Sequence, residues 1–146
     1  MTGAKSFDFH FHHGGVSVPD LDASIDWYRR VLGFEVETRF AIPPIPAEVA
    51  MIRRGDLRME LFAVPGAASL PDDRRVPDLD LKTHGNKHVA FAVADADATA
   101  EDLRARGADI VFVGHFPWGS NVFVRDNTGN LIEFVQQPEM FAEVSP

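Results

Sequence analysis

Cysteine is absent from this chain of 146 residues, which excludes disulfide bonds and thiolate metal ligands. The absence fits a reducing compartment, and we expect a cytoplasmic location. No apolar stretch approaches the ~20 residues that a membrane-spanning helix needs. The first residues lack a basic segment followed by an apolar one, so we expect no signal peptide.

Basic residues are also scarce: 14 Lys and Arg stand against 22 Asp and Glu, and the formal net charge is −8. An acidic surface repels nucleic-acid phosphates and anionic lipids, so we expect neither nucleic acid nor a membrane as partner. Tyrosine occurs once and tryptophan twice, whereas phenylalanine occurs twelve times, which predicts a strongly apolar interior. The phenylalanines also leave room for an apolar pocket, and we expect a small-molecule substrate.

One pattern is present twice. A histidine precedes a short apolar run and a helix, and a glutamate follows later inside an apolar strand. The first copy contains His13 and Glu60, and the second contains His88 and Glu133. The histidines lie 75 residues apart and the glutamates 73. This matched placement predicts a metal site with two ligands from each half.

Each half has the periodicities of a β-α-β-β-β unit. Helices are expected at Asp20–Gly33 and Asp95–Gly107, with acidic N-caps (Asp20 or Asp22, Asp95 or Asp97) and glycine stops. The alternating residues 7–13 predict the first strand. Further strands are expected at 34–40, 50–53 and 58–64 in the first half, and at 109–113, 120–125 and 131–136 in the second.

We expect residues 1–64 to form the first module, 65–87 a Pro-rich linker, 88–138 the second module and 139–146 a C-terminal tail. The linker is long for a compact domain, which indicates a role of its own. The Pro-rich segment Ile42–Pro46 cannot form a central strand, so it is expected to be a loop and a candidate lid.

Small side chains share the face of each histidine in the predicted strands, and bulky ones oppose them. The bulky face is expected to pack on the helix, leaving room around the histidines. A strand carboxylate among apolar residues is costly unless it is paired or metal-bound. Two imidazoles and two carboxylates suit one divalent ion (Ni, Zn, Co, Mn or Fe). The small residues are Gly15 and Ser17 beside His13, and Ala90 and Ala92 beside His88.

The remaining polar and aromatic side chains of interest lie outside the His–Glu repeat. The histidines without a repeat partner are expected at the surface or behind the ligands, and Arg74-Arg75 is expected to be a solvated charge pair. Candidates for the substrate pocket are Ser17, Phe40, Ile45, Phe116 and Trp118, and the unrepeated histidines are His10, His12, His84 and His115.

The motifs resemble those of the vicinal-oxygen-chelate superfamily over about residues 7 to 138. They are His-x6-Asp-Leu-Asp-x2-Ile-x-Trp-Tyr-x3-Leu-Gly-Phe, Lys-His-Val-Ala-Phe-Ala-Val and Arg-Asp-Asn-Thr-Gly-Asn-Leu-Ile-Glu-Phe. The superfamily includes glyoxalase I, methylmalonyl-CoA epimerase, extradiol dioxygenases, and fosfomycin and bleomycin resistance proteins. The resemblance implies an α+β fold of two paired β-α-β-β-β modules, with a curved, cup-like mixed sheet and helices on its outer face.

It also implies one divalent metal ion held by His13, Glu60, His88 and Glu133, within one chain or across a swapped dimer. We therefore expect a homodimer. The complete ligand set is similar to that of glyoxalase I, which implies a lyase or isomerase acting on a small hydroxy-carbonyl compound through a metal-bound enediolate. The catalytic base would be Glu133 or Glu60. Ser17 stands where glutathione-dependent bacterial glyoxalases carry Arg, which implies a substrate that is not a glutathione adduct.

Two other functions stay open. A non-haem Fe(II) ring-cleavage dioxygenase for an aromatic or catechol substrate is compatible with the apolar content. The family's dioxygenases typically use two His and one Glu, so Glu60 argues against it. A drug-binding resistance protein is the second alternative, although such binders often lack the metal ligands.

Overall fold

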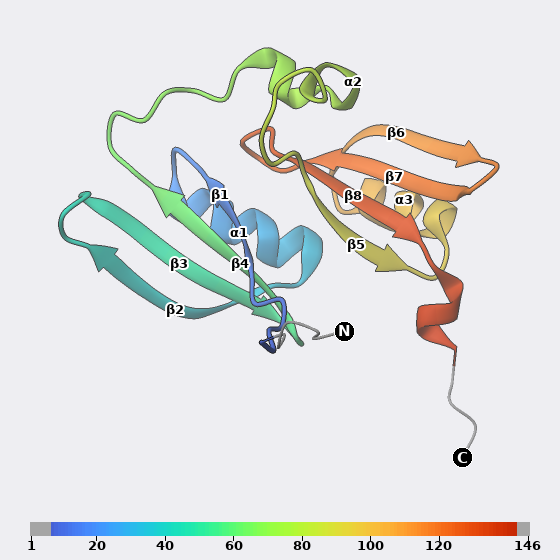
Figure 1. The fold of residues 1–146 in the computed structure, drawn as a ribbon, viewed down its shortest axis with the longest axis horizontal. Helices are drawn as coiled ribbons and strands as arrows, with labels where there is room; N and C mark the ends of the chain where they lie inside the picture. Colours follow the sequence, from blue (N-terminus) through green and yellow to red (C-terminus); the bar gives the residue numbers. More distant parts are fainter. Residues whose placement is uncertain (1–6, 143–146) are drawn as a thin grey trace, which may run out of the picture.

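Two similar modules follow one another along the chain, and each contains one four-stranded sheet (Figure 1). The computed structural model of the protein describes residues 7–142. The first sheet has the order β1-β4-β3-β2 and the second β5-β8-β7-β6. In each sheet the first strand is parallel to its neighbour and the other pairs are antiparallel. The predicted α+β fold of paired modules is confirmed.

The elements lie close to the expected ranges. The first module contains β1 (Gly14–Ser17), α1 (Leu21–Leu32), β2 (Glu35–Ile42), β3 (Ala47–Arg54) and β4 (Leu57–Ala63). The segment between the modules contains η1 (Asp72–Arg75) and α2 (Pro77–Asp80). The second module contains β5 (Val89–Val93), α3 (Ala96–Ala105), β6 (Asp109–Phe116), β7 (Gly119–Arg125) and β8 (Leu131–Gln136), and η2 (Pro138–Phe141) follows it.

Acidic caps position the two long helices. The side chains of Asp20 and Asp95 each accept a hydrogen bond of 3.0 Å from the backbone N–H three residues on, so these two aspartates are the caps. Helix α1 ends at Gly33, which adopts the left-handed conformation with φ 75°. The helices therefore begin where the sequence predicts, immediately after the first strand of each module.

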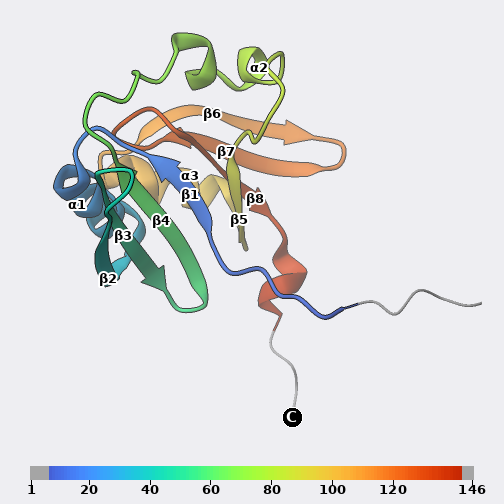
Figure 2. The same cartoon turned by 60° about the vertical axis from the view of Figure 1, so that its left-hand side comes forward.

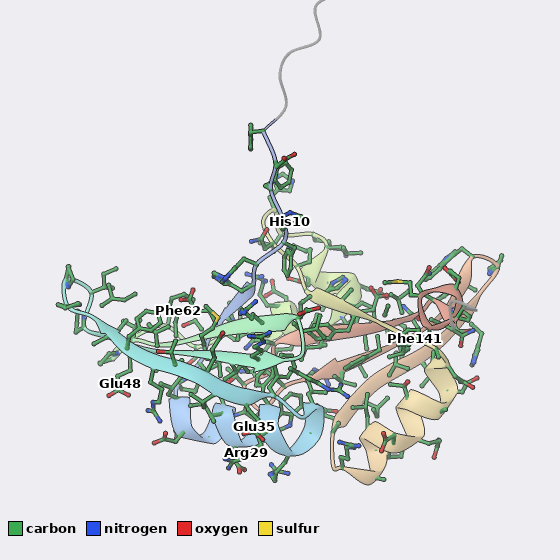
Figure 3. The ribbon with its side chains drawn as sticks, turned by 90° about the horizontal axis from the view of Figure 1, so that it is seen from below. His10, Arg29, Glu35, Glu48, Phe62 and Phe141 are labelled. Atoms are coloured by element: carbon green, nitrogen blue, oxygen red, sulfur yellow. The ribbon has the colours of Figure 1, made fainter. Side chains whose placement is uncertain are left out.

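Both long helices lie on one side of the two sheets (Figure 3). The core lies between helices and sheets, and it continues from one module to the other. At the junction the Tyr28 hydroxyl donates a hydrogen bond of 2.8 Å to Asp126, and the Phe34 and Phe91 ring centroids are 6.2 Å apart. The opposite faces of the sheets carry the predicted ligands.

The prediction of a strand at residues 7–13 is wrong. This segment has no regular secondary structure, and β1 begins only at Gly14. Its alternating Phe7, Phe9 and Phe11 are 80%, 80% and 79% exposed. Residues 7–12 run away from both sheets (Figure 2), so none of the strands between residues 7 and 142 lies beside the arm to pair with it. Alternation predicts an extended chain, but a strand also needs a hydrogen-bonding partner.

The linker is held by a buried carboxylate. Asp80 at the end of α2 is 2% exposed, and its side chain is 2.5 Å from Nε of Arg74 and 3.3 Å from Nζ of Lys87. The backbone carbonyl of Arg75 accepts a hydrogen bond of 2.8 Å from Arg125 of β7. The expectation that Arg74-Arg75 is a solvated charge pair is wrong, because both residues are half-buried: Arg74 is paired with Asp80, and Nη2 of Arg75 donates a hydrogen bond of 3.4 Å to the carbonyl of Leu70.

Between residues 7 and 142, none of the helices combines the length and apolarity needed to cross a bilayer.

Candidate metal centre

The first candidate pair lies where β1 runs parallel to β4. The register places Gly15 opposite Glu60, and His13 stands just before β1 on the same face as Gly15. Nε2 of His13 lies 3.2 Å from Oε1 of Glu60. Parallel pairing of the first and last strands therefore brings together residues that are 47 positions apart.

The second pair repeats this construction in the second module. Ala90 of β5 lies opposite Glu133 of β8, and His88 immediately precedes β5. Nε2 of His88 lies 3.4 Å from Oε1 of Glu133. The side chains of Glu60 and Glu133 have the same exposed fraction, 16%. The repeat seen in the sequence is thus also present in three dimensions, as two similar His–Glu pairs.

The predicted division of faces is present in the second module. Val89, Phe91 and Val93 pack against the common core. Ala90 lies on the other face of β5 and is exposed. In the first module Gly15 and Ser17 are exposed in the same way. The side of the sheets that carries the candidate ligands is therefore lined by small residues next to each histidine.

The geometry of each pair fits two ligands of one divalent ion. Ligands about 2.1 Å from the same ion and about 100° apart lie about 3.2 Å from each other. Imidazole nitrogen and carboxylate oxygen are also the donors preferred by the first-row metals. Both the distance and the chemistry of each pair are consistent with metal binding.

The four residues remain in two pairs. Within residues 7–142, no three or more His, Asp or Glu side chains are close enough together to hold an ion. The edge strands β1 and β5, which follow the two candidate histidines, do come close to each other, because a methyl group at Gly14 of β1 would lie 4.0 Å from Cγ2 of Val89 of β5. A four-ligand site requires the two pairs to converge further.

Two residues that the sequence analysis missed support the second pair. Nδ2 of Asn121 donates a hydrogen bond of 2.8 Å to Oε2 of Glu133. The Phe123 ring packs edge-on against His88, with centroids 4.8 Å apart. One signal was available, because an Asn inside the strand run 120–125 is unusual for a residue type that strands disfavour.

The unrepeated histidines are exposed, as expected. Nε2 of His115 lies 2.9 Å from the Asp97 carboxylate on the outside of α3. His12 differs from the rest, because its Nδ1 lies 2.7 Å from Nδ1 of His13. One of these two rings donates to the other, so His12 is in contact with a candidate ligand.

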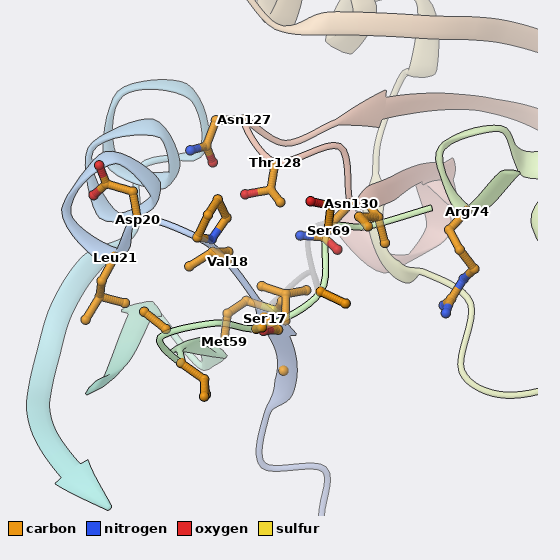
Figure 4. A pocket seen from close by; sticks show the side chains of 18 of the residues that line it. Ser17, Val18, Asp20, Leu21, Met59, Ser69, Arg74, Asn127, Thr128 and Asn130 are labelled. Atoms are coloured by element: carbon orange, nitrogen blue, oxygen red, sulfur yellow. The ribbon is translucent and has the colours of Figure 1, made fainter. Parts of the chain in front are cut away.

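The main cavity is a cleft of about 1440 Å³ between the end of β1, the linker and the start of β5 (Figure 4). Polar side chains of Ser69, Thr128 and Asn130 border it. Ser17 and His88 line this cleft, so it connects with the second candidate pair.

The other four predicted pocket residues do not line the cleft. Phe40 and Ile45 belong to the β2–β3 hairpin, and Phe116 and Trp118 to the β6–β7 hairpin. All four are exposed. The Phe116 and Trp118 rings stack on each other, with centroids 4.8 Å apart. Their assignment to the pocket therefore stays a prediction.

Residues 10–134 match the Glyoxalase/Bleomycin resistance protein/Dioxygenase superfamily. The chain belongs to this superfamily. The resemblance to the vicinal-oxygen-chelate proteins predicted from the sequence is thereby confirmed.

Two relatives with assigned activities are epimerases. The chain is 32% identical to a 2-epi-5-epi-valiolone epimerase from Actinomyces sp. over 110 residues, which cover 65% of this chain and 57% of the relative. It is 30% identical to the mitochondrial methylmalonyl-CoA epimerase of Mus musculus over 95 residues, covering 65% and 52%. The chain thus spans about half the length of the curated relatives it matches.

Among solved structures, a glyoxalase family protein from Enterococcus faecalis has a TM-score of 0.73. Its sequence identity is 20%, and the alignment covers 87% of this chain and 97% of that protein. This likeness shows that the two share the fold.

Proposed function

We propose that this chain is a divalent-metal-dependent isomerase that moves a proton on the carbon beside a carbonyl group of a small hydroxy-carbonyl compound. The observation that carries the proposal is the repeated His–Glu pair, His13 with Glu60 and His88 with Glu133, at 3.2 and 3.4 Å. The two epimerase relatives support this reaction class, since epimerisation also moves a proton on carbon.

In this proposal His13, Glu60, His88 and Glu133 hold one metal ion. When bound, the ion supplies positive charge that stabilises the negative charge developing on the carbonyl oxygen. Two neutral imidazoles and two carboxylates leave the loaded site near electroneutral, which limits the cost of burying it.

The carboxylates carry out the proton transfer. One of them takes the proton from the carbon, and the C–H electron pair moves into the carbon skeleton, so that charge collects on the carbonyl oxygen. The resulting carboxyl group returns the proton to the carbon skeleton, and the electrons move back. Glu60 and Glu133 stand on different sheets, so they can approach a substrate between the sheets from different sides.

We also propose that the protein works as a homodimer. The exposed Phe7, Phe9 and Phe11 form an apolar arm that makes little contact with its own chain. Three phenylalanine rings on each of two copies would bury on the order of 1000 Å² of apolar surface. That area approaches the lower bound of about 1,200 Å² for a stable interface.

Solvent exchange tests the proposed reaction. The metal-loaded protein is incubated in deuterium oxide with a panel of small hydroxy-ketones and hydroxy-aldehydes, and deuterium at the carbon beside the carbonyl is measured by mass spectrometry. We expect incorporation that stops when a chelator removes the metal and returns when Mn²⁺ or Co²⁺ is added.

An oxygen electrode separates this reaction from ring cleavage. The iron-loaded protein is supplied with catechols under air. Oxygen uptake with ring-opened product, and no deuterium incorporation in the first experiment, would refute the isomerase proposal in favour of a dioxygenase. Exchange with no oxygen uptake supports it.

A further inference from the structure

The two candidate carboxylates have different surroundings, although the modules repeat. Oε2 of Glu133 accepts the 2.8 Å hydrogen bond from Asn121, while its Oε1 faces His88. Glu60 has its Oε1 beside His13, and no side chain in the described part of the protein donates to its Oε2. One glutamate is therefore held at both oxygens and the other at one.

The strand register explains the difference. In the second module Asn121 of β7 stands opposite Val135, next to Glu133 on the same face. In the first module the corresponding residue of β3 is Val49, opposite Phe62. Valine has no donor, so Glu60 cannot have the matching hydrogen bond.

Asn121 is itself fixed in place. It is 3% exposed. Its Oδ1 has no hydrogen-bond partner among the described residues, so packing holds this side of the amide. A Cβ at Gly114 on the neighbouring strand β6 would lie 2.4 Å from this Oδ1 and 2.3 Å from the Phe116 ring. Only glycine leaves space for the amide at this position, so the local structure is built around Asn121.

The orientation of the amide follows from the chemistry of its partner. An ionised carboxylate only accepts hydrogen bonds, so the NH₂ group must face Glu133. A donated hydrogen bond to one oxygen restricts the rotation of the carboxylate. Carboxylates that ligate metals are typically held by an outer partner in this way.

We infer that Asn121 is a positioning residue that makes Glu133 the stationary metal ligand and leaves Glu60 as the carboxylate that moves and transfers the proton. This inference rests on the proposed function. Glu60 would then take the proton from the substrate carbon and its carboxyl group would return it, while Glu133 would remain one of the residues that hold the ion. The sequence alone left the choice between the two glutamates open.

Metal affinity gives a test that does not depend on turnover. Mn²⁺ dissociation constants are measured by calorimetry for the full chain and for Asn121→Leu, Asn121→Asp, Glu60→Gln and Glu133→Gln. We expect both Asn121 variants to weaken Mn²⁺ binding by about 10- to 100-fold. Glu133→Gln should weaken it more than Glu60→Gln does.

A double-mutant cycle shows whether Asn121 acts through Glu133. Adding Asn121→Leu to Glu133→Gln should change Mn²⁺ affinity by less than about 3-fold, because the partner is already lost. Adding it to Glu60→Gln should still cost about 10- to 100-fold. Equal effects in both backgrounds would overturn the inference.

Two further variants separate positioning from general damage to the sheet. Gly114→Ala leaves Asn121 in the sequence but pushes its amide away, so Mn²⁺ affinity should fall in the same direction. Gln136→Leu removes an amide of β8 that instead accepts a hydrogen bond from the N–H of Ala96 at the start of α3. That control should lower thermal stability and leave Mn²⁺ affinity unchanged.

The Co²⁺ absorption spectrum provides an independent readout. It should change in Asn121→Leu and Gly114→Ala, because the Glu133 oxygen moves relative to the ion, and should stay the same in Gln136→Leu. If the Asn121 variants bind Mn²⁺ like the wild type and keep its Co²⁺ spectrum, the inference is wrong while the proposed function stands. A wild-type chain that binds neither metal would refute the proposed function itself.

Discussion

At the scale of single residues, the two modules have the same His–Glu pairs but different supports around them. The sequence repeat shows which four residues correspond, and the parallel pairing of β1 with β4 and of β5 with β8 brings each His to its Glu. Asn121 and Phe123 could not be predicted in this way. They have no equivalent of their kind in the first module, where Val49 and Met51 stand instead.

His13 provides the direct check of the ligand assignment. We expect His13→Ala to weaken binding of Zn²⁺ or Mn²⁺ by more than about 100-fold, because one of two imidazole donors is lost. His115→Ala is the matched control, since His115 is exposed and lies beside Asp97. Metal content after dialysis is measured by mass spectrometry, and unchanged content in His13→Ala would refute the site.

Because of Tyr28, we expect the free energy of unfolding to depend on pH in the alkaline range. Burial first, and then the Asp126 carboxylate, raise the pKa of its hydroxyl well above the ordinary value of 10.0. The unfolded chain loses this proton near pH 10 while the folded chain keeps it. The unfolded state therefore binds fewer protons above pH 10, and the free energy of unfolding falls as the pH rises further.

The test uses the fact that the chain has a single tyrosine. In an alkaline titration, phenolate absorbance should appear only together with the loss of circular dichroism. Tyr28→Phe should cost about 1–3 kcal/mol at neutral pH, because Asp126 loses a donor, and should remove the tyrosine-linked part of the alkaline decline. A phenolate signal near pH 10 in a fully folded protein would contradict this account.

At the scale of elements, local signals predicted the helices well and the first strand badly. Helix caps and periodicity act within a few residues, so Asp20, Gly33 and Asp95 mark the helix ends in the sequence itself. A strand depends on a distant partner. The segment 7–13 has the right alternation, but no strand in the described part of the chain pairs with it, whereas β1 pairs with β4.

The contacts that hold the linker, residues 65–87, could not be predicted from the sequence. Asp80→Asn should destabilise the protein by about 2–3 kcal/mol, since Arg74 and Lys87 would lose their buried partner. This loss of unfolding free energy is smaller than for a fully buried ion pair, because the Arg74 and Lys87 side chains remain partly exposed. Urea unfolding and limited proteolysis of residues 65–87 provide the measurement.

Asp78→Asn is the control for this change, because Asp78 is an exposed residue of the same short helix α2. It should leave both the urea midpoint and the cleavage rate unchanged. Equal protease sensitivity in the two variants would show that Asp80 does not hold the linker.

At the scale of the whole molecule, the edge strands β1 and β5 come close to each other, and each pairs with the strand that carries a candidate glutamate. The arm of residues 7–12 leaves the body of the protein (Figure 2). We expect the wild-type chain to be a dimer in light scattering. The triple change Phe7→Ser, Phe9→Ser and Phe11→Ser should produce a monomer, because the apolar surface that drives association is lost.

Leu81→Ser serves as a control, since Leu81 is 67% exposed on the linker and lies outside the arm. It should remain dimeric. A triple variant that stays dimeric at low micromolar concentration would place the contact elsewhere.

The sequence by itself determined the superfamily, the paired β-α-β-β-β modules, the helix boundaries and the four candidate ligands. Periodicity and helix caps are local signals that can be read from a few neighbouring residues. The repeat can be found by comparing the two halves of the sequence directly. The tertiary structure decided which distant residues meet. It formed the hydrogen bond from Asn121 to Glu133, anchored the linker at Asp80, and left residues 7–13 without a partner strand among the described residues. Strand register and packing set these contacts, and both depend on residues far apart in the chain.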